Sequence, residues 1–73
     1  MTAFELNVGE SARIIKLNIF GGAKDRLISL GIENGARISL LGFSFFKSSV
    51  LLSCGAARVA MRKSLAQKIE VER

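Results

Sequence analysis

Two glycines four residues apart, Gly31 and Gly35, constrain this chain more than any other feature, because each marks a change of chain direction. They lie in the stretch RLISLGIENGARISLL, residues 26–41, which passes from a helical pattern to a strand pattern. Gly31 stands where a residue in the left-handed conformation ends a helix, and glycine adopts that conformation without a clash of a Cβ atom. Asn34 and Gly35 form a dipeptide typical of turns, after which the chain is predicted to enter a strand. Gly31, Asn34 and Gly35 are therefore interpreted as structural turn residues.

Five short segments have the alternation of apolar and polar residues that is typical of strands: residues 11–20, 36–41, 50–54, 57–62 and 68–72. One short helix is predicted over residues 23–30, and one helical turn over 64–67, with Ser64 as its cap. In the first strand, the pattern places Ile15 on the inner face and Ile14 on the outer face. Five strands in so short a chain must curl to bury one face and protect the edges. The prediction is a mainly β fold, a small, partly open barrel of about five strands with one short helix and one helical turn.

The length of 73 residues predicts a single domain that covers residues 1–73. One cysteine excludes an intrachain disulfide, and the absence of histidine excludes a structural metal site with histidine ligands. No uninterrupted apolar run exceeds three residues, so no membrane-spanning helix is predicted. The first ten residues lack the basic region and the long apolar region of a signal peptide, and a cytoplasmic location is expected.

The residue types that most enzymes need are missing. Nucleophilic catalysis pairs Ser, Cys or Thr with a base, and the usual base, histidine, is absent. Of the six acidic residues, only Glu70 and Glu72 are close in sequence, and the strand pattern points both outward. Cys54 is interpreted as a small buried apolar residue. The chain is therefore predicted to have no catalytic residue, no metal site and no cofactor, and to be a binding module.

The net charge of +5 suits an anionic partner, although basic residues spread over the whole chain also make an ordinary soluble surface. Within one predicted strand, Arg58 and Arg62 lie on the same outward face. They form a local basic patch that could meet an acidic partner, and a solvated face is the alternative.

The second candidate contact is FSFF, which holds three of the five phenylalanines, Phe43, Phe45 and Phe46, in a predicted loop or hairpin tip over residues 42–49. The spacing places Phe43 and Phe45 on one face and Phe46 on the other. Either these rings plug the mouth of the barrel, or they form an exposed apolar contact for a partner or a second copy of the chain. Because the core is small, at least one ring is expected to be exposed.

Over residues 6–72 the sequence resembles the ferrous iron transport protein A family (FeoA). Members of the family share a central motif, R-L-x-x-L-G-[IVL]-x-x-G. This chain matches it at Arg26, Leu27, Leu30, Gly31, Ile32 and Gly35. They also share a C-terminal motif, L-R-x-x-x-A-x-x-I-x-V. This chain matches it at Arg62, Ala66, Ile69 and Val71, and has Met61 in place of the leucine. Asn34 replaces a common proline, and FSFFKSS lacks the Gly-Asp-Pro character of the family loop.

The resemblance implies an SH3-like barrel. It also implies a non-enzymatic accessory that binds the cytoplasmic part of a membrane GTPase, the transporter called ferrous iron transport protein B, and supports iron uptake. Two alternatives stay open. One is a small basic nucleic-acid-binding barrel, although strand aromatics interleaved with basic residues are missing and nucleic acid is an unlikely partner. The other is an SH3-like module related to metal-dependent repressors of the diphtheria-toxin-repressor type.

Overall fold

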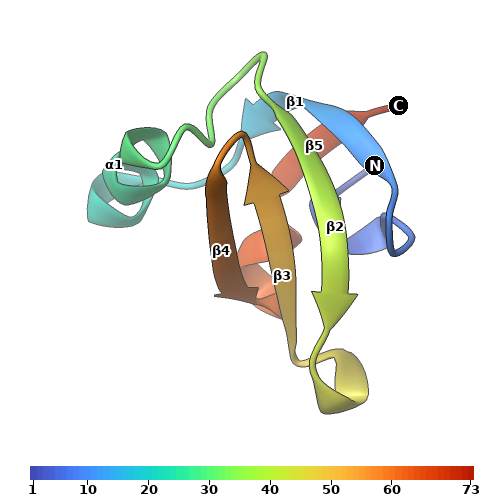
Figure 1. Ribbon diagram of the computed structural model, residues 1–73. Helices are drawn as coiled ribbons and strands as arrows, with labels where there is room; N and C mark the ends of the chain where they lie inside the picture. Colours follow the sequence, from blue (N-terminus) through green and yellow to red (C-terminus); the bar gives the residue numbers. More distant parts are fainter.

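The strands form one antiparallel sheet in the order β4-β3-β2-β1-β5 in the computed structural model, which describes residues 1–73 (Figure 1). The strands are β1 (Ser11–Leu17), β2 (Arg37–Phe43), β3 (Ser49–Cys54), β4 (Ala57–Arg62) and β5 (Ile69–Glu72). The helices are α1 (Gly21–Ser29) and α2 (Lys63–Ala66), and the 3₁₀ turns are η1 (Ala3–Glu5) and η2 (Phe45–Lys47). The predicted five-strand, open-barrel fold with one helix and short helical turns is confirmed.

Two register shifts curl the sheet. One lies between Ile14 and Lys16, where β1 pairs with β5, and the other lies between Leu40 and Gly42, where β2 pairs with β3. A bulge adds one residue on one strand, bends it and increases its twist, and so helps a short sheet to close on itself.

The first shift overturns the predicted orientation of β1. Ile14 is buried, whereas Ile15 has 45% of its surface exposed, which is the reverse of the strict alternation expected from the sequence. The extra residue at the bulge interrupts the two-residue period. Two successive residues, Ile15 and Lys16, therefore face outward, and the next residue, Leu17, faces the core. Leu17 and Ile19 are therefore buried as predicted.

The core contains only apolar side chains. Sixteen residues are buried, none of them polar or charged, so the interior offers no titratable group for chemistry. Its largest fully buried members come from four of the five strands, β1, β2, β3 and β5, and from the turn after α1: Ile14, Ile32, Ile38, Leu40, Leu52, Ile69, Val50 and Val71. Three matched residues of the C-terminal motif, Ala66, Ile69 and Val71, are in this core, as expected for residues that specify the fold.

The end of α1 has the hydrogen bonds predicted from Gly31. The N–H of Gly31 donates to the carbonyl of Ile28 at 2.9 Å, and the N–H of Ile32 donates to that of Leu27 at 2.9 Å. This is the Schellman motif, and Gly31 has φ +90°. Leu27 and Ile32, the two residues expected to accompany the motif, are both buried. The thiol of Cys54, which is half-buried, donates to the carbonyl of Gly31 at 3.3 Å.

The Asn34–Gly35 turn is also present. The N–H of Ala36 donates to the carbonyl of Glu33 at 3.0 Å, and Gly35 has φ +89°. A type II turn requires a positive φ at its third residue and a negative φ at its second, and Gly35 and Asn34 fulfil these two conditions. The N–H of Gly35 also donates to the carbonyl of Ile14 at 2.8 Å, so the turn is bonded directly to β1.

Two details at the ends of the chain differ from the sequence prediction. The helical turn α2 begins at Lys63, with Arg62 at its N-cap and no side-chain capping bond, so Ser64 lies inside it and is not the cap. The turn η1 was not predicted. Its signal is the spacing of Thr2 and Glu5, because the N–H of Thr2 donates to Oε1 of Glu5 at 2.7 Å. This bond to the backbone of Thr2 is the main cause that lowers the pKa of the Glu5 carboxyl.

Gly31→Val should destabilise the domain more than Ile32→Val. A β-branched residue resists φ +90°, and the strain should cost about 1–3 kcal/mol. Space is not the cause, because a Cβ atom at position 31 would lie 3.7 Å from Sγ of Cys54, an ordinary contact. Denaturant midpoints of the two variants provide the test. An unchanged midpoint for Gly31→Val would contradict the role assigned to this glycine.

Candidate binding surface

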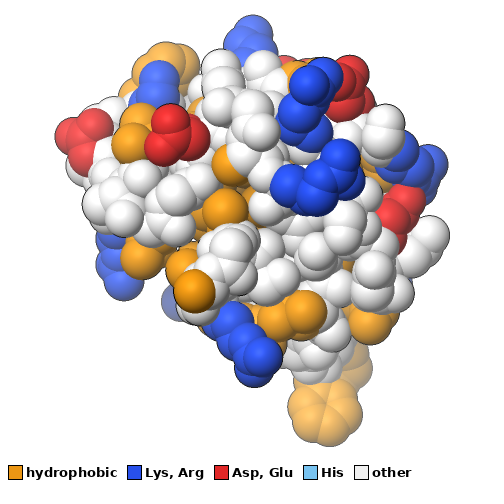
Figure 2. Space-filling view, turned by 45° about the horizontal axis from the view of Figure 1, so that its top comes forward, with side chains coloured by type: hydrophobic (Ala, Val, Ile, Leu, Met, Phe, Trp, Pro, Cys, Tyr) orange, Lys and Arg blue, Asp and Glu red, His pale blue; other side chains and the backbone are white.

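The connection between β2 and β3 projects two aromatic rings into solvent. Phe45 is 90% exposed and Phe46 is 99% exposed, and together they are called the aromatic tip. The β2–β3 connection lies at the lower end of the molecule in Figure 1, and Figure 2 shows apolar side chains that project at its lower end. The prediction that at least one phenylalanine of the loop is exposed is confirmed.

Serine side chains close the loop beneath the tip. The two hydroxyls of Ser44 and Ser48 lie 3.0 Å apart, and the N–H of Ser49 donates to Oγ of Ser44 at 2.9 Å. Phe46 and Lys47 have φ values of 59° and 54°, and they are the only residues other than glycine with positive φ. L-residues with large side chains rarely adopt this conformation. The local hydrogen bonds therefore hold the backbone in a shape that directs the two rings outward.

Phe43 behaves differently from the tip. It is half-buried, and its ring meets the ring of Phe4 edge to face, with centroids 5.6 Å apart. The expectation that Phe43 and Phe45 share a face is wrong, because β2 ends at Phe43 and the 3₁₀ turn η2 breaks the strand alternation. The two interpretations of FSFF are thus each right for a part of it. Phe43 covers the end of the core, and Phe45 and Phe46 are exposed.

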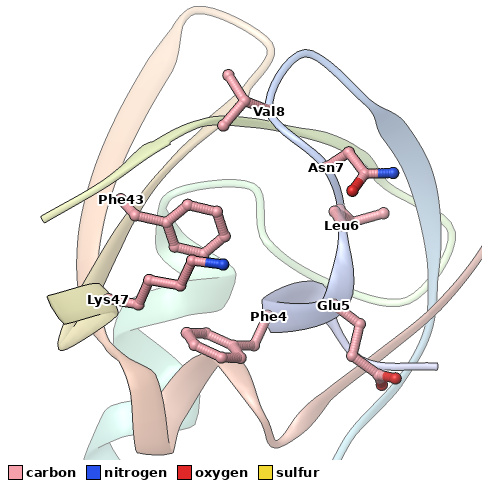
Figure 3. A pocket seen from close by; sticks show the side chains of 7 residues that line it. All are labelled: Phe4, Glu5, Leu6, Asn7, Val8, Phe43 and Lys47. Atoms are coloured by element: carbon pink, nitrogen blue, oxygen red, sulfur yellow. The ribbon is translucent and has the colours of Figure 1, made fainter.

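An open groove of about 640 Å³ lies beside the tip, between the N-terminal segment and the end of β2 (Figure 3). The rings of Phe4 and Phe43 line it, and the ammonium group of Lys47 lies 4.9 Å from the centre of the Phe43 ring. Lys63 is placed in the same way, 5.1 Å from the centre of the Phe4 ring. Such contacts between cations and rings fix the two lysines without neutralising their charge.

Arg58 and Arg62 are exposed on the outer face of β4, as predicted, but they lie at different heights on the barrel. Arg62 pairs with Ser49 and is therefore beside the β2–β3 loop, whereas Arg58 pairs with Ser53 near the opposite end of the hairpin. Four residues of a strand span about 13 Å. The structure thus brings Arg62, but not Arg58, to the end of the barrel that carries the aromatic tip.

The acidic and cysteine side chains are scattered over the molecule. No three side chains of Asp, Glu or Cys gather in a group that could hold a metal ion. No helix is long and apolar enough to cross a membrane. Exposed aromatic rings beside fixed cations suit a contact that is apolar at its centre and anionic around it. The fold defines a small SH3-like barrel.

The comparisons with known proteins identify the family. The model of the FeoA domain matches residues 1–73, and the chain therefore belongs to the FeoA family. The iron(II) transport protein A of Clostridium thermocellum is 28% identical with a TM-score of 0.90, over 99% of this chain and 44% of that one. The FeoA protein of Chlorobium tepidum is 27% identical with a TM-score of 0.91, over 97% of this chain and 68% of that one.

The FeoA protein of Stenotrophomonas maltophilia was solved with zinc and is described as an SH3 domain protein possibly acting as a ferrous iron transport activating factor. It is 25% identical with a TM-score of 0.85, over 99% of this chain and 89% of that one. A manganese-dependent transcriptional repressor is 18% identical with a TM-score of 0.83, over 97% of this chain and 39% of that one, a likeness of fold alone. No curated protein matches the sequence.

The double variant Phe45→Ser, Phe46→Ser should fold as well as the wild type. Both rings are exposed, so their removal takes little buried surface from the folded state. The single variant Phe43→Ser should lose about 2–4 kcal/mol, because it removes a ring packed on Phe4 and places a hydroxyl there. Thermal unfolding followed by circular dichroism compares them. A double variant less stable than Phe43→Ser would mean that the tip belongs to the core.

Proposed function

We propose that this protein is a non-enzymatic, cytoplasmic accessory of the ferrous iron transporter, ferrous iron transport protein B. It binds the cytoplasmic part of that membrane protein and supports the uptake of ferrous iron. The observation that supports this most is membership of the FeoA family over the whole chain. The relative from Stenotrophomonas maltophilia, described as a possible transport activating factor, adds support.

The physical properties of the chain agree with a role in binding. The core is wholly apolar and the unusual features are all on the surface, where an aromatic tip, a groove and outward arginines lie. The proposed contacts are the aromatic tip with its supporting Phe43, and the arginines of β4. The tip is also a candidate contact between two copies of the chain, which sedimentation of the wild type and the tip variant would test.

Charge reversal on β4 should weaken binding to the transporter. We expect Arg58→Glu, Arg62→Glu to lose about tenfold in affinity for the isolated cytoplasmic part, because like charges then face an acidic partner. The measurement is a pull-down with and without guanine nucleotide. The matched control is Arg37→Glu, Lys68→Glu, which changes the net charge equally at two other exposed positions.

Two results would contradict the proposal in different ways. If the wild-type protein does not bind the cytoplasmic part in any nucleotide state, the accessory role is wrong. If both charge-reversal variants bind like the wild type, the arginines of β4 are not the contact. A gel shift with short DNA and RNA at several salt concentrations tests the nucleic-acid alternative, for which binding should fall steeply as salt rises.

The accessory role also predicts that ferrous iron is not carried by this chain. Carboxylates scattered over the surface and one thiol make a poor site for a transition metal. Anaerobic calorimetry with ferrous iron should show no saturable site tighter than about 1 μM, which corresponds to about −8 kcal/mol. A stoichiometric tight site would instead indicate an iron carrier.

A further inference from the structure

The aromatic tip is an unusual surface for a contact between two proteins. Aromatic anchors of protein interfaces lie near the centre of a patch, with a ring of polar contacts that excludes water around them. Phe45 and Phe46 are instead nine-tenths or more exposed, in a loop that projects beyond the strands (Figure 1). The backbone of Phe46 and of Lys47 after it is held in a conformation that bulky residues disfavour, so the outward direction is built into the loop.

Basic side chains surround the base of the tip. Lys47 follows it directly, and Lys63 is bound to the same loop, because its N–H donates to the carbonyl of Ser48 at 3.0 Å. Arg62 is beside the loop through its pairing with Ser49. The lysines rest on the rings of Phe43 and Phe4, at 4.9 and 5.1 Å, which keeps their ammonium groups at this end of the barrel.

Acidic side chains are nearly absent from this end. Glu5 is the one acidic residue that lines the adjoining groove. Two others are paired elsewhere, Glu72 with Arg13 and Glu10 with Arg73. Glu70 accepts a hydrogen bond from Asn18. The end with the tip therefore combines two exposed rings with an excess of positive charge.

We propose that the aromatic tip inserts into the surface of an anionic lipid bilayer, with Lys47, Arg62 and Lys63 against the headgroups. The interfacial region of a bilayer favours aromatic rings. Negatively charged headgroups attract basic side chains close to the surface. A bilayer also adapts its shape to a projecting loop, whereas a protein partner would need a preformed pocket for two adjacent rings.

This inference deepens the proposed function, since a protein bound to the cytoplasmic part of a transporter lies next to the membrane. It replaces the transporter by the bilayer as the partner of the tip and of Arg62, and leaves Arg58, at the other end of β4, to contact the transporter. The two proposals can fail separately, because lipid binding is tested with vesicles alone and transporter binding with a lipid-free cytoplasmic part.

The first test is flotation of the protein with vesicles. The wild type should float with vesicles of phosphatidylcholine and phosphatidylglycerol, but not with phosphatidylcholine alone, and high salt should release it. Phe45→Ser, Phe46→Ser should bind at least about tenfold more weakly, because each buried ring contributes appreciably to binding. The matched control is Phe20→Ser, which removes a ring that is 84% exposed at the start of α1.

The second test locates the tip with a single fluorophore. The chain contains no tryptophan and no tyrosine, so Phe46→Trp introduces the only strong emitter. Its emission should shift to the blue and become protected from an aqueous quencher when anionic vesicles are added. Phe20→Trp, away from the tip, should not shift.

Three results would overturn the proposal. One is a failure of the wild type to float with anionic vesicles at low salt, and another is equal flotation of the wild type and the tip variant. The third is an unshifted Phe46→Trp signal in the presence of vesicles. If the tip variant also loses binding to the lipid-free cytoplasmic part, the tip contacts protein, and the accessory role stands without the lipid contact. If the variant instead loses oligomers in sedimentation and the wild type ignores vesicles, the partner of the tip is a second copy.

Discussion

The structure depends on β1, because this strand joins β5, at the end of the chain, to the rest of the sheet. It lies between β2 and β5, and its bulge lets it turn from one to the other. This pairing brings the two ends of the chain together. The N–H of Val71 donates to the carbonyl of Met1 at 2.8 Å, and Thr2 forms a bridge with Glu70. The guanidinium of Arg73 binds Glu10, which, with the N–H of Asn7, lowers the pKa of that carboxyl.

The site follows from this closure. With the N-terminal turn η1 fixed to β5 by the bridge at Thr2, Phe4 is positioned to meet the ring of Phe43 at the end of β2. The packed pair closes the core at this end, so the next two phenylalanines find no room inside and are directed outward by the loop. Exposure of the aromatic tip is thus a consequence of how the core is completed.

The core is apolar throughout, so every charged side chain lies at or near the surface. With no buried polar group, the interior provides neither a desolvated base nor a paired ion to activate a nucleophile. On the surface, apolar and charged groups can be combined freely because water stabilises the charged ones. Binding specificity in such a domain comes from which side chains its loops and edge strands present.

The sequence by itself determined the turns at Gly31 and Gly35, the number of strands and the apolar character of the core. Gly31, Asn34 and Gly35 have local conformational preferences, and local preferences act through neighbouring residues alone. Residues 69–72 alternate without interruption and were placed correctly for the same reason. Only the tertiary structure decided the orientation of Ile14 and Ile15, because the bulge arises from pairing with β5, more than fifty residues along the chain. It likewise decided which phenylalanine is covered, since Phe43 finds a partner in Phe4, a contact between residues distant in sequence that no local pattern encodes.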